Sequence, residues 1–186
     1  MTTYFHFRVS IDGIKPAIER SFLLTKSASF YDLHMAIQDA FGWQNYHLFA
    51  FRVDPRGDVL AGIAEPGEPD PDARKVRLTA LFGKRGGTRC LYQYDFGDDW
   101  WHVVEFEGEL ELPGRQRRVL LDGKRSCPPE DCGGVYGYSR AVAAATGKRW
   151  RAEFGDAEER RAIVEWLGGW KPDDFDLAKA RSRFDE

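Results

Sequence analysis

The sequence predicts an α+β fold with a mostly antiparallel, mixed sheet whose first elements follow a grasp-like β-β-α-β order. Three observations support it: strand-like alternation near the N-terminus, one helical stripe after it, and a return to strand-like runs before a helical C-terminal part. The chain has 186 residues and 42% hydrophobic content, which is enough to bury one core. We therefore expect a single domain over residues 1–186, with helices packed on one side of the sheet and at the C-terminus.

The N-terminal segment predicts a hairpin of two strands. Apolar residues alternate with polar ones, as a half-buried strand requires, at Phe5, Phe7, Val9 and Ile11. A turn at Asp12-Gly13 follows, and residues 18–24 have the same character. We expect these two runs to pair in antiparallel fashion.

The next segment predicts a helix. Ser29 provides a side-chain cap, and Asp32 reaches back to it from the third helical position. Gly42 is a natural stop for this helix. Its apolar stripe consists of Phe30, Leu33, Ile37 and Phe41. A strand over residues 47–53 then completes the β-β-α-β start.

The middle of the chain predicts a long surface loop followed by further strands. Residues 54–72 are rich in Pro, Gly, Asp and Glu, which favour turns and give this segment no packed face of its own. Further strands are expected over residues 75–81, 89–96, 101–107 and 117–121.

The C-terminal part predicts three helices. The first ends at Gly147. The second is capped by Asp156 with Glu159 and ends at a Gly-Gly pair after Leu167. A last short helix is expected after Asp176.

Charge and hydropathy give little support to nucleic-acid binding and none to a membrane span. A net charge of -3 and a pI near 5.9 give no overall attraction to nucleic acid, so such binding would need a local patch. The best basic group is formed by Arg115, Arg117 and Arg118, although separated charges of this kind usually belong to a solvated surface. No apolar run is long enough to span a membrane, and the N-terminus lacks the zones of a signal peptide, so we expect a cytoplasmic protein.

The string YDFGDDWWH at residues 94–102 predicts a tight hairpin with two alternative turns. If its Gly-Asp step forms a two-residue turn, Asp95 and His102 fall on one side of the sheet. If its Gly-Asp-Asp step forms a three-residue loop, His102 lies next to Tyr94 on the opposite face from Asp95. Both faces carry aromatic residues, so the sequence leaves the choice open.

Carboxylates near a histidine are able to hold a divalent cation or to act as a general acid and base. The alternative is that Asp98 and Asp99 are turn residues with local hydrogen bonds, and that His102 is a satisfied strand histidine. His34 and His47 lie where either could reach a shared site, but histidines beside an apolar face are usually packed residues.

The string CPPEDCGGVYGY at residues 127–138 predicts a rigid loop that presents carboxylates. Its two prolines stiffen the backbone, and Glu130 and Asp131 come directly before a Gly-Gly pair that has access to positive φ. Tyr136 and Tyr138 add amphipathic surface suited to stacking or hydrogen bonding with a ligand. The alternative is that the two carboxylates cap backbone amides and fix the loop before the next helix.

These strings make the chain resemble the plasmid pRiA4b ORF-3-like family. The family pattern reads LHxxIQxAFGWxxxHLxxF, YxYDFGDxWxH, CPPEDxGGxxGY and WLGG followed by FDL, and here it falls on residues 33–51, 92–102, 127–138, 166–169 and 175–177. The resemblance covers nearly the whole chain. It implies a compact α+β domain, often encoded on plasmids or carried by insertion elements, with no established activity.

Two positions depart from the family pattern. Glu19 stands where the family usually has tryptophan, so a charge replaces an aromatic contact. Residues 117–120 stand where the family usually has another cysteine, which speaks against a thiol or metal pairing with Cys127.

We therefore hypothesise a non-enzymatic binding or accessory domain, associated with plasmids or mobile elements. Its two motifs converge into one acidic, aromatic-lined cleft for an ion, a peptide or a small ligand. We assign no catalytic residue, no metal ligand and no cofactor. The ligand-binding candidates are Asp95, Asp98, Asp99, Trp100, His102, Glu130, Asp131, Tyr136 and Tyr138.

Two other hypotheses stay open. The first is a metal-dependent hydrolase acting on phosphoesters. Its ligands or base would be Asp95, Asp98, His102, Glu130 and Asp131. The second is a nucleic-acid-binding adjunct that uses Arg115, Arg117 and Arg118.

Overall fold

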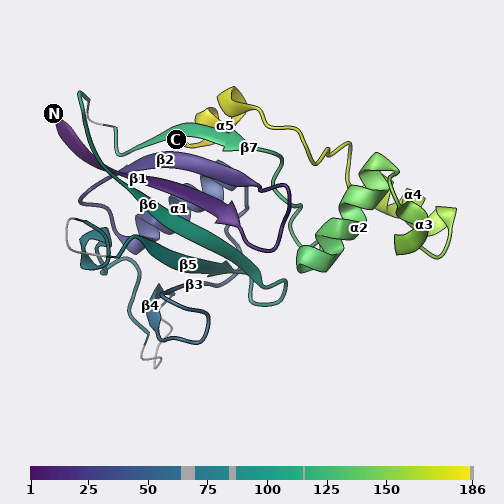
Figure 1. The fold of residues 1–186 in the computed structure, drawn as a ribbon, viewed down its shortest axis with the longest axis horizontal. Coiled ribbons are helices and arrows are strands. Elements are labelled where there is room, and N and C mark those ends of the chain that lie inside the picture. Colours follow the sequence, from purple (N-terminus) through teal and green to yellow (C-terminus); the bar gives the residue numbers. More distant parts are fainter. Residues whose placement is uncertain (64–69, 84–86, 115, 185–186) are drawn as a thin grey trace.

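The protein is built on one seven-stranded sheet (Figure 1). The structure is a computed structural model that describes residues 1–63, 70–83, 87–114 and 116–184. The strands lie in the order β4-β3-β5-β6-β1-β2-β7, and each pair of neighbours is antiparallel. Their bounds are β1 (Thr2–Ile11), β2 (Glu19–Thr25), β3 (Phe49–Arg52), β4 (Val59–Gly62), β5 (Arg89–Tyr94), β6 (Trp100–Leu112) and β7 (Arg118–Lys124). The α+β prediction is confirmed.

The predicted N-terminal hairpin is confirmed. Strand β1 pairs with β2 from Tyr4 opposite Thr25 to Ser10 opposite Glu19. The apolar residues of β1 at odd positions are buried, whereas Arg8 is exposed. Glu19 forms an ion pair with Lys124 of the neighbouring strand.

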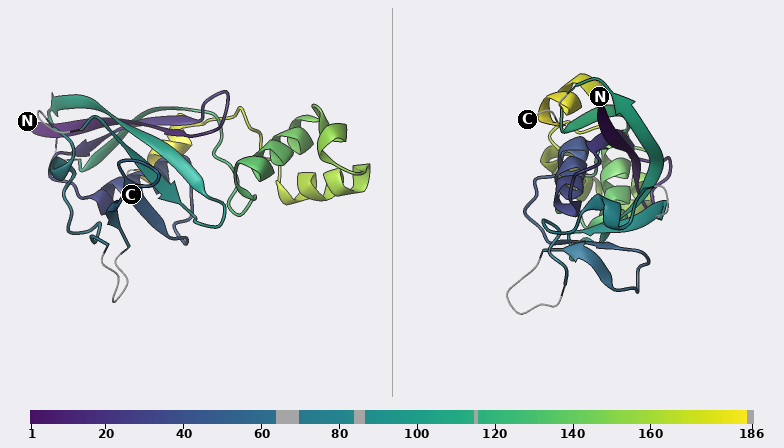
Figure 2. Two further views of the ribbon diagram at one scale, coloured as in Figure 1. Left: turned by 60° about the horizontal axis from the view of Figure 1, so that its bottom comes forward. Right: turned by 90° about the vertical axis from the view of Figure 1, so that its left-hand side faces the viewer.

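Helix α1 (Phe30–Phe41) covers one face of the sheet, which curves around it (Figure 2). Ser29 and Asp32 form the predicted capping box, and Gly42 ends the helix with a φ of 91°, where a side chain would be strained. The predicted apolar stripe is buried in the main core between helix and sheet. The β-β-α-β start is therefore present as predicted.

The last helix, α5 (Leu177–Phe184), contacts both α1 and the edge strand β7. It begins directly after Asp176, as the sequence predicts. Phe184 is fully buried next to Phe22 of β2, with ring centroids 5.6 Å apart.

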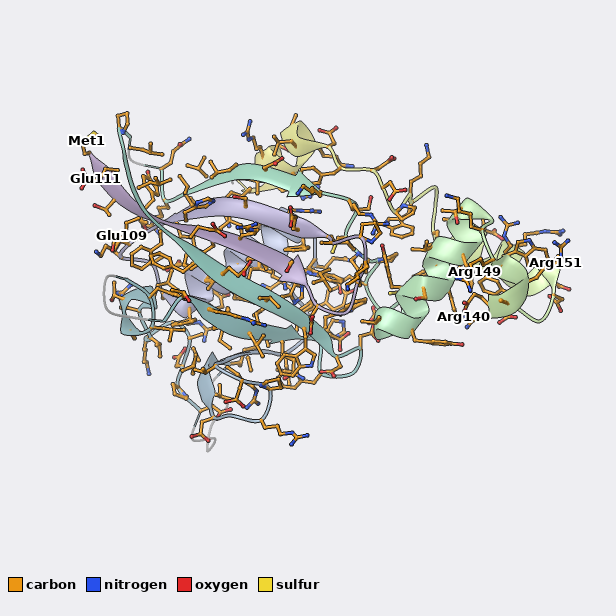
Figure 3. The ribbon with its side chains drawn as sticks, viewed as in Figure 1. Met1, Glu109, Glu111, Arg140, Arg149 and Arg151 are labelled. Carbon is orange, nitrogen blue, oxygen red and sulfur yellow. The ribbon has the colours of Figure 1, made fainter. Side chains whose placement is uncertain are left out.

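Three helices form a lobe beside the sheet, at the right of Figure 1. They are α2 (Gly134–Thr146), α3 (Trp150–Glu153) and α4 (Ala157–Trp166). Asp156 caps α4 as predicted. The lobe has a small core of its own, and Figure 3 shows Arg140, Arg149 and Arg151 on it, far from Met1. That this lobe and the sheet form a single domain over residues 1–186 stays a prediction.

Two predicted elements are wrong. Residues 75–81 do not form a strand but a turn and a short 3-10 helix. The reason is that this segment packs against the start of α1, where the Val76 carbonyl accepts a hydrogen bond from the Phe30 amide (2.9 Å). The loop predicted over residues 54–72 contains strand β4, although residues 64–69 of that loop lie outside the described part of the chain. Within the described residues, no helix is long and apolar enough to cross a membrane.

Candidate functional site

The connection between β5 and β6 is a five-residue loop, Asp95–Asp99, and both predicted turns are wrong. Tyr94 pairs with Trp100, and Tyr92 pairs with His102. The Asp95 side chain explains the longer loop, because its Oδ1 accepts hydrogen bonds from the amides of Gly97 (3.0 Å) and Asp98 (3.3 Å). This carboxylate closes the loop together with the hydrogen bond from the Asp99 amide to the Asp95 carbonyl (2.7 Å).

The register places Trp100 and His102 in the core and not in the loop. Both side chains are fully buried. His102 Nδ1 lies 3.3 Å from the Tyr92 carbonyl oxygen, and its ring packs against Phe41 of α1. Burial lowers the pKa of His102 to about 4. These two ligand-binding candidates therefore belong to the buried interior.

The loop Asp95–Asp99 meets the loop that precedes α2. Asp98 Oδ2 accepts a hydrogen bond from the amide of Gly133, the N-cap residue of α2 (3.0 Å). Tyr94 donates its hydroxyl to Glu130 Oε1 (3.2 Å). Two segments about thirty positions apart are thus joined by direct hydrogen bonds.

Gly134 is required where these loops touch. Its φ is +66°, and a Cβ built on it would overlap with the backbone carbonyl of Asp98. The preceding Gly133 has a φ of +92°, but its Cβ would meet nothing closer than 3.7 Å. The contact between the loops therefore needs glycine at position 134 because a side chain would overlap with the Asp98 backbone. At position 133 it needs glycine only because the φ is positive.

We predict that Gly134→Ala destabilises the protein more than Gly133→Ala. Both changes place a side chain at positive φ, which costs about 1 kcal/mol, and Gly134→Ala adds an overlap with backbone worth about 1–3 kcal/mol more. Urea denaturation of the two variants measures the difference. Equal losses of stability would show that the two loops are not in contact.

His47 joins the two loops. Its position in the sequence placed it within reach of a shared site, but it was not among the predicted ligand-binding candidates. It lies between α1 and β3, and its Nε2 is 3.6 Å from Asp95 Oδ2 and 3.1 Å from Asp131 Oδ1. Tyr46 donates its hydroxyl to Asp131 Oδ2 (3.2 Å). A signal for His47 existed, since it is the histidine of the HLxxF string in the first family motif.

Glu130 fixes the loop before α2 against the end of α1. Its Oε1 accepts a hydrogen bond from the Gln44 amide (2.6 Å) and another from Tyr94. Burial raises the pKa of Glu130, and these two donors act in the opposite direction. Glu130 therefore braces the loop, as one of the two predictions states, and it also lies with Asp131 in an acidic group, as the other states.

A pocket of about 560 Å³ opens between the sheet and the helical lobe. Its charged and aromatic lining includes Glu130 and Asp131 together with Tyr46 from the sheet side. Trp166 and Trp170 supply the lobe side, and Trp170 donates its indole N–H to the Cys127 carbonyl (2.9 Å). The pocket is therefore acidic and aromatic.

The remaining candidates lie outside this pocket. Tyr138 is buried against Trp170, whereas Tyr136 is 70% exposed and does not line the pocket. Both belong to α2, which begins earlier than predicted. Asp99 accepts a hydrogen bond from the Gln93 side chain (2.6 Å), so it acts within its own hairpin.

The basic candidates lie around a different hollow. Arg117 and Arg118 line a pocket of about 1150 Å³ together with residues of β1 and β2. Arg118 forms an ion pair with Asp39. Arg115 lies outside the described residues. The structure therefore leaves Arg118 with a compensated charge.

Comparisons with known proteins agree with the resemblance seen in the motifs. The model of the plasmid pRiA4b ORF-3-like protein family matches residues 3–179. The uncharacterized protein y4hQ of Sinorhizobium fredii (strain NBRC 101917 / NGR234) is 33% identical over 176 residues, which cover 93% of this chain and 84% of that protein. The crystal structure of MM3350, a protein of unknown function from Methanosarcina mazei Go1, has a TM-score of 0.81 and 33% sequence identity, and the match covers 96% of this chain and 97% of that one.

Proposed function

Because this chain belongs to the plasmid pRiA4b ORF-3-like family, and the two relatives described above carry no activity in their names, we propose its function from the pocket itself: it is a binding domain for a cationic ligand. The observation that carries the proposal is the meeting of acidic and aromatic side chains around one pocket. The ligand class is an ammonium or guanidinium group, as in the lysine and arginine side chains of a basic peptide.

The charges of the pocket support a cation. Glu130 and Asp131 line it, and Asp95 lies just behind them, within reach of His47. Among the described residues that line the pocket, none is a lysine or arginine, so the charged side chains of the lining would repel an anionic ligand.

The aromatic side chains support an organic cation. Tyr46 is 55% exposed and Trp166 is 53% exposed, although both are large and largely apolar. The face of such a ring attracts ammonium and guanidinium groups by about 0.5–2 kcal/mol. A volume of about 560 Å³ lies within the range of small-ligand pockets and suits one or two basic side chains.

The acidic group is held in place before any ligand arrives. The Gln44 amide and the Tyr94 hydroxyl hold Glu130, and the Tyr46 hydroxyl holds Asp131. These hydrogen bonds go to one oxygen of each carboxylate, Glu130 Oε1 and Asp131 Oδ2, and fix the orientation of both groups. Such preorganisation lowers the entropy lost on binding.

We predict that a short fluorescent peptide rich in lysine and arginine binds the full chain, and that Asp131→Asn and Trp166→Ala each weaken binding by about fivefold. This factor corresponds to about 1 kcal/mol, the size of one partly screened charge or one cation–π contact. Fluorescence anisotropy at low and moderate salt measures the affinities. Both changed side chains are exposed, so the fold should tolerate the substitutions.

Asp99→Asn is the matched control for charge. It removes the same charge from the neighbouring hairpin, but Asp99 does not line the pocket and bonds to Gln93. A glutamate-rich peptide of the same length controls for nonspecific binding. Equal affinity of the parent, Asp131→Asn and Trp166→Ala proteins would reject the proposal.

The two alternative hypotheses have less support. A phosphoester hydrolase needs both a bound cation and room for an anionic substrate, and the acidic lining of the pocket opposes the second requirement. Nucleic-acid binding rests on Arg117 and Arg118, of which Arg118 is paired with Asp39. A cytoplasmic location and an association with mobile elements belong to this proposal as expectations, and the second rests on the family's name.

A further inference from the structure

We propose that His47, Asp95 and Asp131 form a binding site for a divalent metal ion at the inner edge of the pocket. The three residues come from three separate segments: the connection between α1 and β3, the loop Asp95–Asp99, and the loop before α2. Each offers one ligand atom, and the three atoms lie within 4.8 Å of one another.

Two of the three distances between the donor atoms fit one shared ion, and the third lies within 4.8 Å. Donors that bind a cation at about 2.0–2.2 Å lie about 3.0–3.5 Å apart when they occupy neighbouring coordination positions. His47 Nε2 lies 3.1 Å from Asp131 Oδ1 and 3.6 Å from Asp95 Oδ2. A small movement of exposed Asp131 would complete the geometry.

A second observation points to a ligand at this place. Asp95 is only 7% exposed, and within the described residues its Oδ2 accepts no hydrogen bond. His47 Nε2 is a buried atom, and within the described residues it lacks a hydrogen bond with suitable alignment, despite its short distance to Asp131. Buried polar atoms are normally satisfied, so this imidazole nitrogen, which faces two carboxylate oxygens, indicates a missing partner.

The surrounding hydrogen bonds orient the proposed ligands. The amides of Gly97 and Asp98 hold Asp95 Oδ1 and leave Oδ2 directed at His47. The Tyr46 hydroxyl holds Asp131 Oδ2 and leaves Oδ1 directed at the same nitrogen. Metal-binding carboxylates are commonly held in this way by outer hydrogen bonds, which also strengthen metal binding.

The ligand set selects the class of ion. One imidazole nitrogen and two carboxylate oxygens suit Zn²⁺, Mn²⁺ or Co²⁺, whereas Ca²⁺ and Mg²⁺ prefer sites made of oxygen alone. Three protein ligands leave further coordination positions for water or another ligand. Asp131 belongs to both groups of residues, so the ion would lie at the edge of the proposed cation pocket. His47 and Asp95 do not line that pocket, so the metal site does not rest on the proposed function.

The test is titration of the full chain, after dialysis against a chelator, with Zn²⁺, Mn²⁺ and Co²⁺ in separate calorimetric experiments. We expect one ion bound per chain, and visible absorption from bound Co²⁺. His47→Gln and Asp131→Asn should each weaken binding at least about tenfold, since each removes one of three ligands. Far-UV circular dichroism checks that these variants are folded.

Two controls separate this site from the cationic-ligand pocket. Asp99→Asn removes a nearby carboxylate that is not a ligand, and Trp166→Ala removes an aromatic wall, so both should bind metal like the parent protein. Loss of metal binding only in His47→Gln and Asp131→Asn supports the site. No binding of any of the three ions, or binding that these two changes leave intact, would show that His47 is only an imidazole paired with carboxylates.

Discussion

Replacing Arg20 with alanine should lower the free energy of unfolding by about 4 kcal/mol. Arg20 lies on β2 and is 2% exposed, and its guanidinium donates hydrogen bonds to four backbone carbonyls. Each buried acceptor left without a donor costs about 1 kcal/mol or more. Urea denaturation, with the midpoint and slope fitted together, measures the loss.

The position of Arg20 explains why one side chain has so large an effect. Its Nε binds the Ala40 carbonyl at the C-terminal end of α1, where the helix dipole favours a positive charge. Its other nitrogens donate to the Glu19 carbonyl of β2 and to the carbonyls of Lys124 and Arg125, at the end of the neighbouring strand β7. The guanidinium also lies between the rings of Phe41 (4.8 Å) and Phe175 (4.2 Å). One residue thus joins the helix, the sheet edge and the C-terminal segment.

Two further variants make the Arg20 prediction specific. Arg8→Ala changes an exposed arginine on the neighbouring strand, where an ion pair with Glu107 contributes about 1 kcal/mol or less. Arg20→Lys keeps the charge but has neither the planar fork nor enough donors for four carbonyls, so it should recover only part of the loss. Losses of similar size for Arg20→Ala and Arg8→Ala would contradict the role assigned to Arg20.

Local signals in the sequence predicted most of the fold. The capping pair Ser29 and Asp32 and the stop at Gly42 fixed the bounds of α1, because caps act between residues a few positions apart. The alternation of β1 predicted its buried face for the same reason. Residues 75–81 misled because apolar residues that pack under a helix alternate in the same way as those of a strand.

The site depends on interactions that local patterns do not contain. The length of the loop Asp95–Asp99 follows from one side chain that binds two amides, and a turn rule that counts residues misses it. Tyr136 and Tyr138 look equivalent in the string, but α2 turns them in different directions, so one is exposed and the other is buried. His47 enters the site only through the meeting of three distant segments.

Lowering the pH from 7 to 4.5 should reduce the free energy of unfolding through two buried histidines. Burial lowers the pKa of His34 and of His102 to about 4, whereas an unfolded histidine has a pKa near 6.5. Between these values the unfolded chain binds more protons than the folded one, so stability is lost as pH falls from about 6.5 towards 4. The loss at pH 4.5 is about 2 kcal/mol for each histidine, and urea denaturation across this range measures it.

The surroundings of the two histidines hold them neutral. His34 lies between the Tyr92 hydroxyl (2.8 Å) and the Asn45 side-chain oxygen (2.7 Å), neither of which carries a charge. Because the Asn45 side-chain oxygen can only accept, His34 Nε2 carries the hydrogen of the neutral ring. His34 Nδ1 then accepts from the Tyr92 hydroxyl, whose oxygen accepts from Gln38. His102 faces the Tyr92 carbonyl and aromatic rings.

His102→Phe isolates one of the two titrations. The variant keeps an aromatic ring in an aromatic environment and removes a group whose Nε2 has no hydrogen bond within the described residues. It should lose about half of the decrease in stability between pH 7 and 4.5. His6→Gln, which changes a half-buried histidine on the other face of β1, should retain most of the decrease. A pH profile that His102→Phe leaves unchanged would contradict the lowered pKa of His102, because a group with the same pKa in the folded and unfolded states does not couple folding to proton binding.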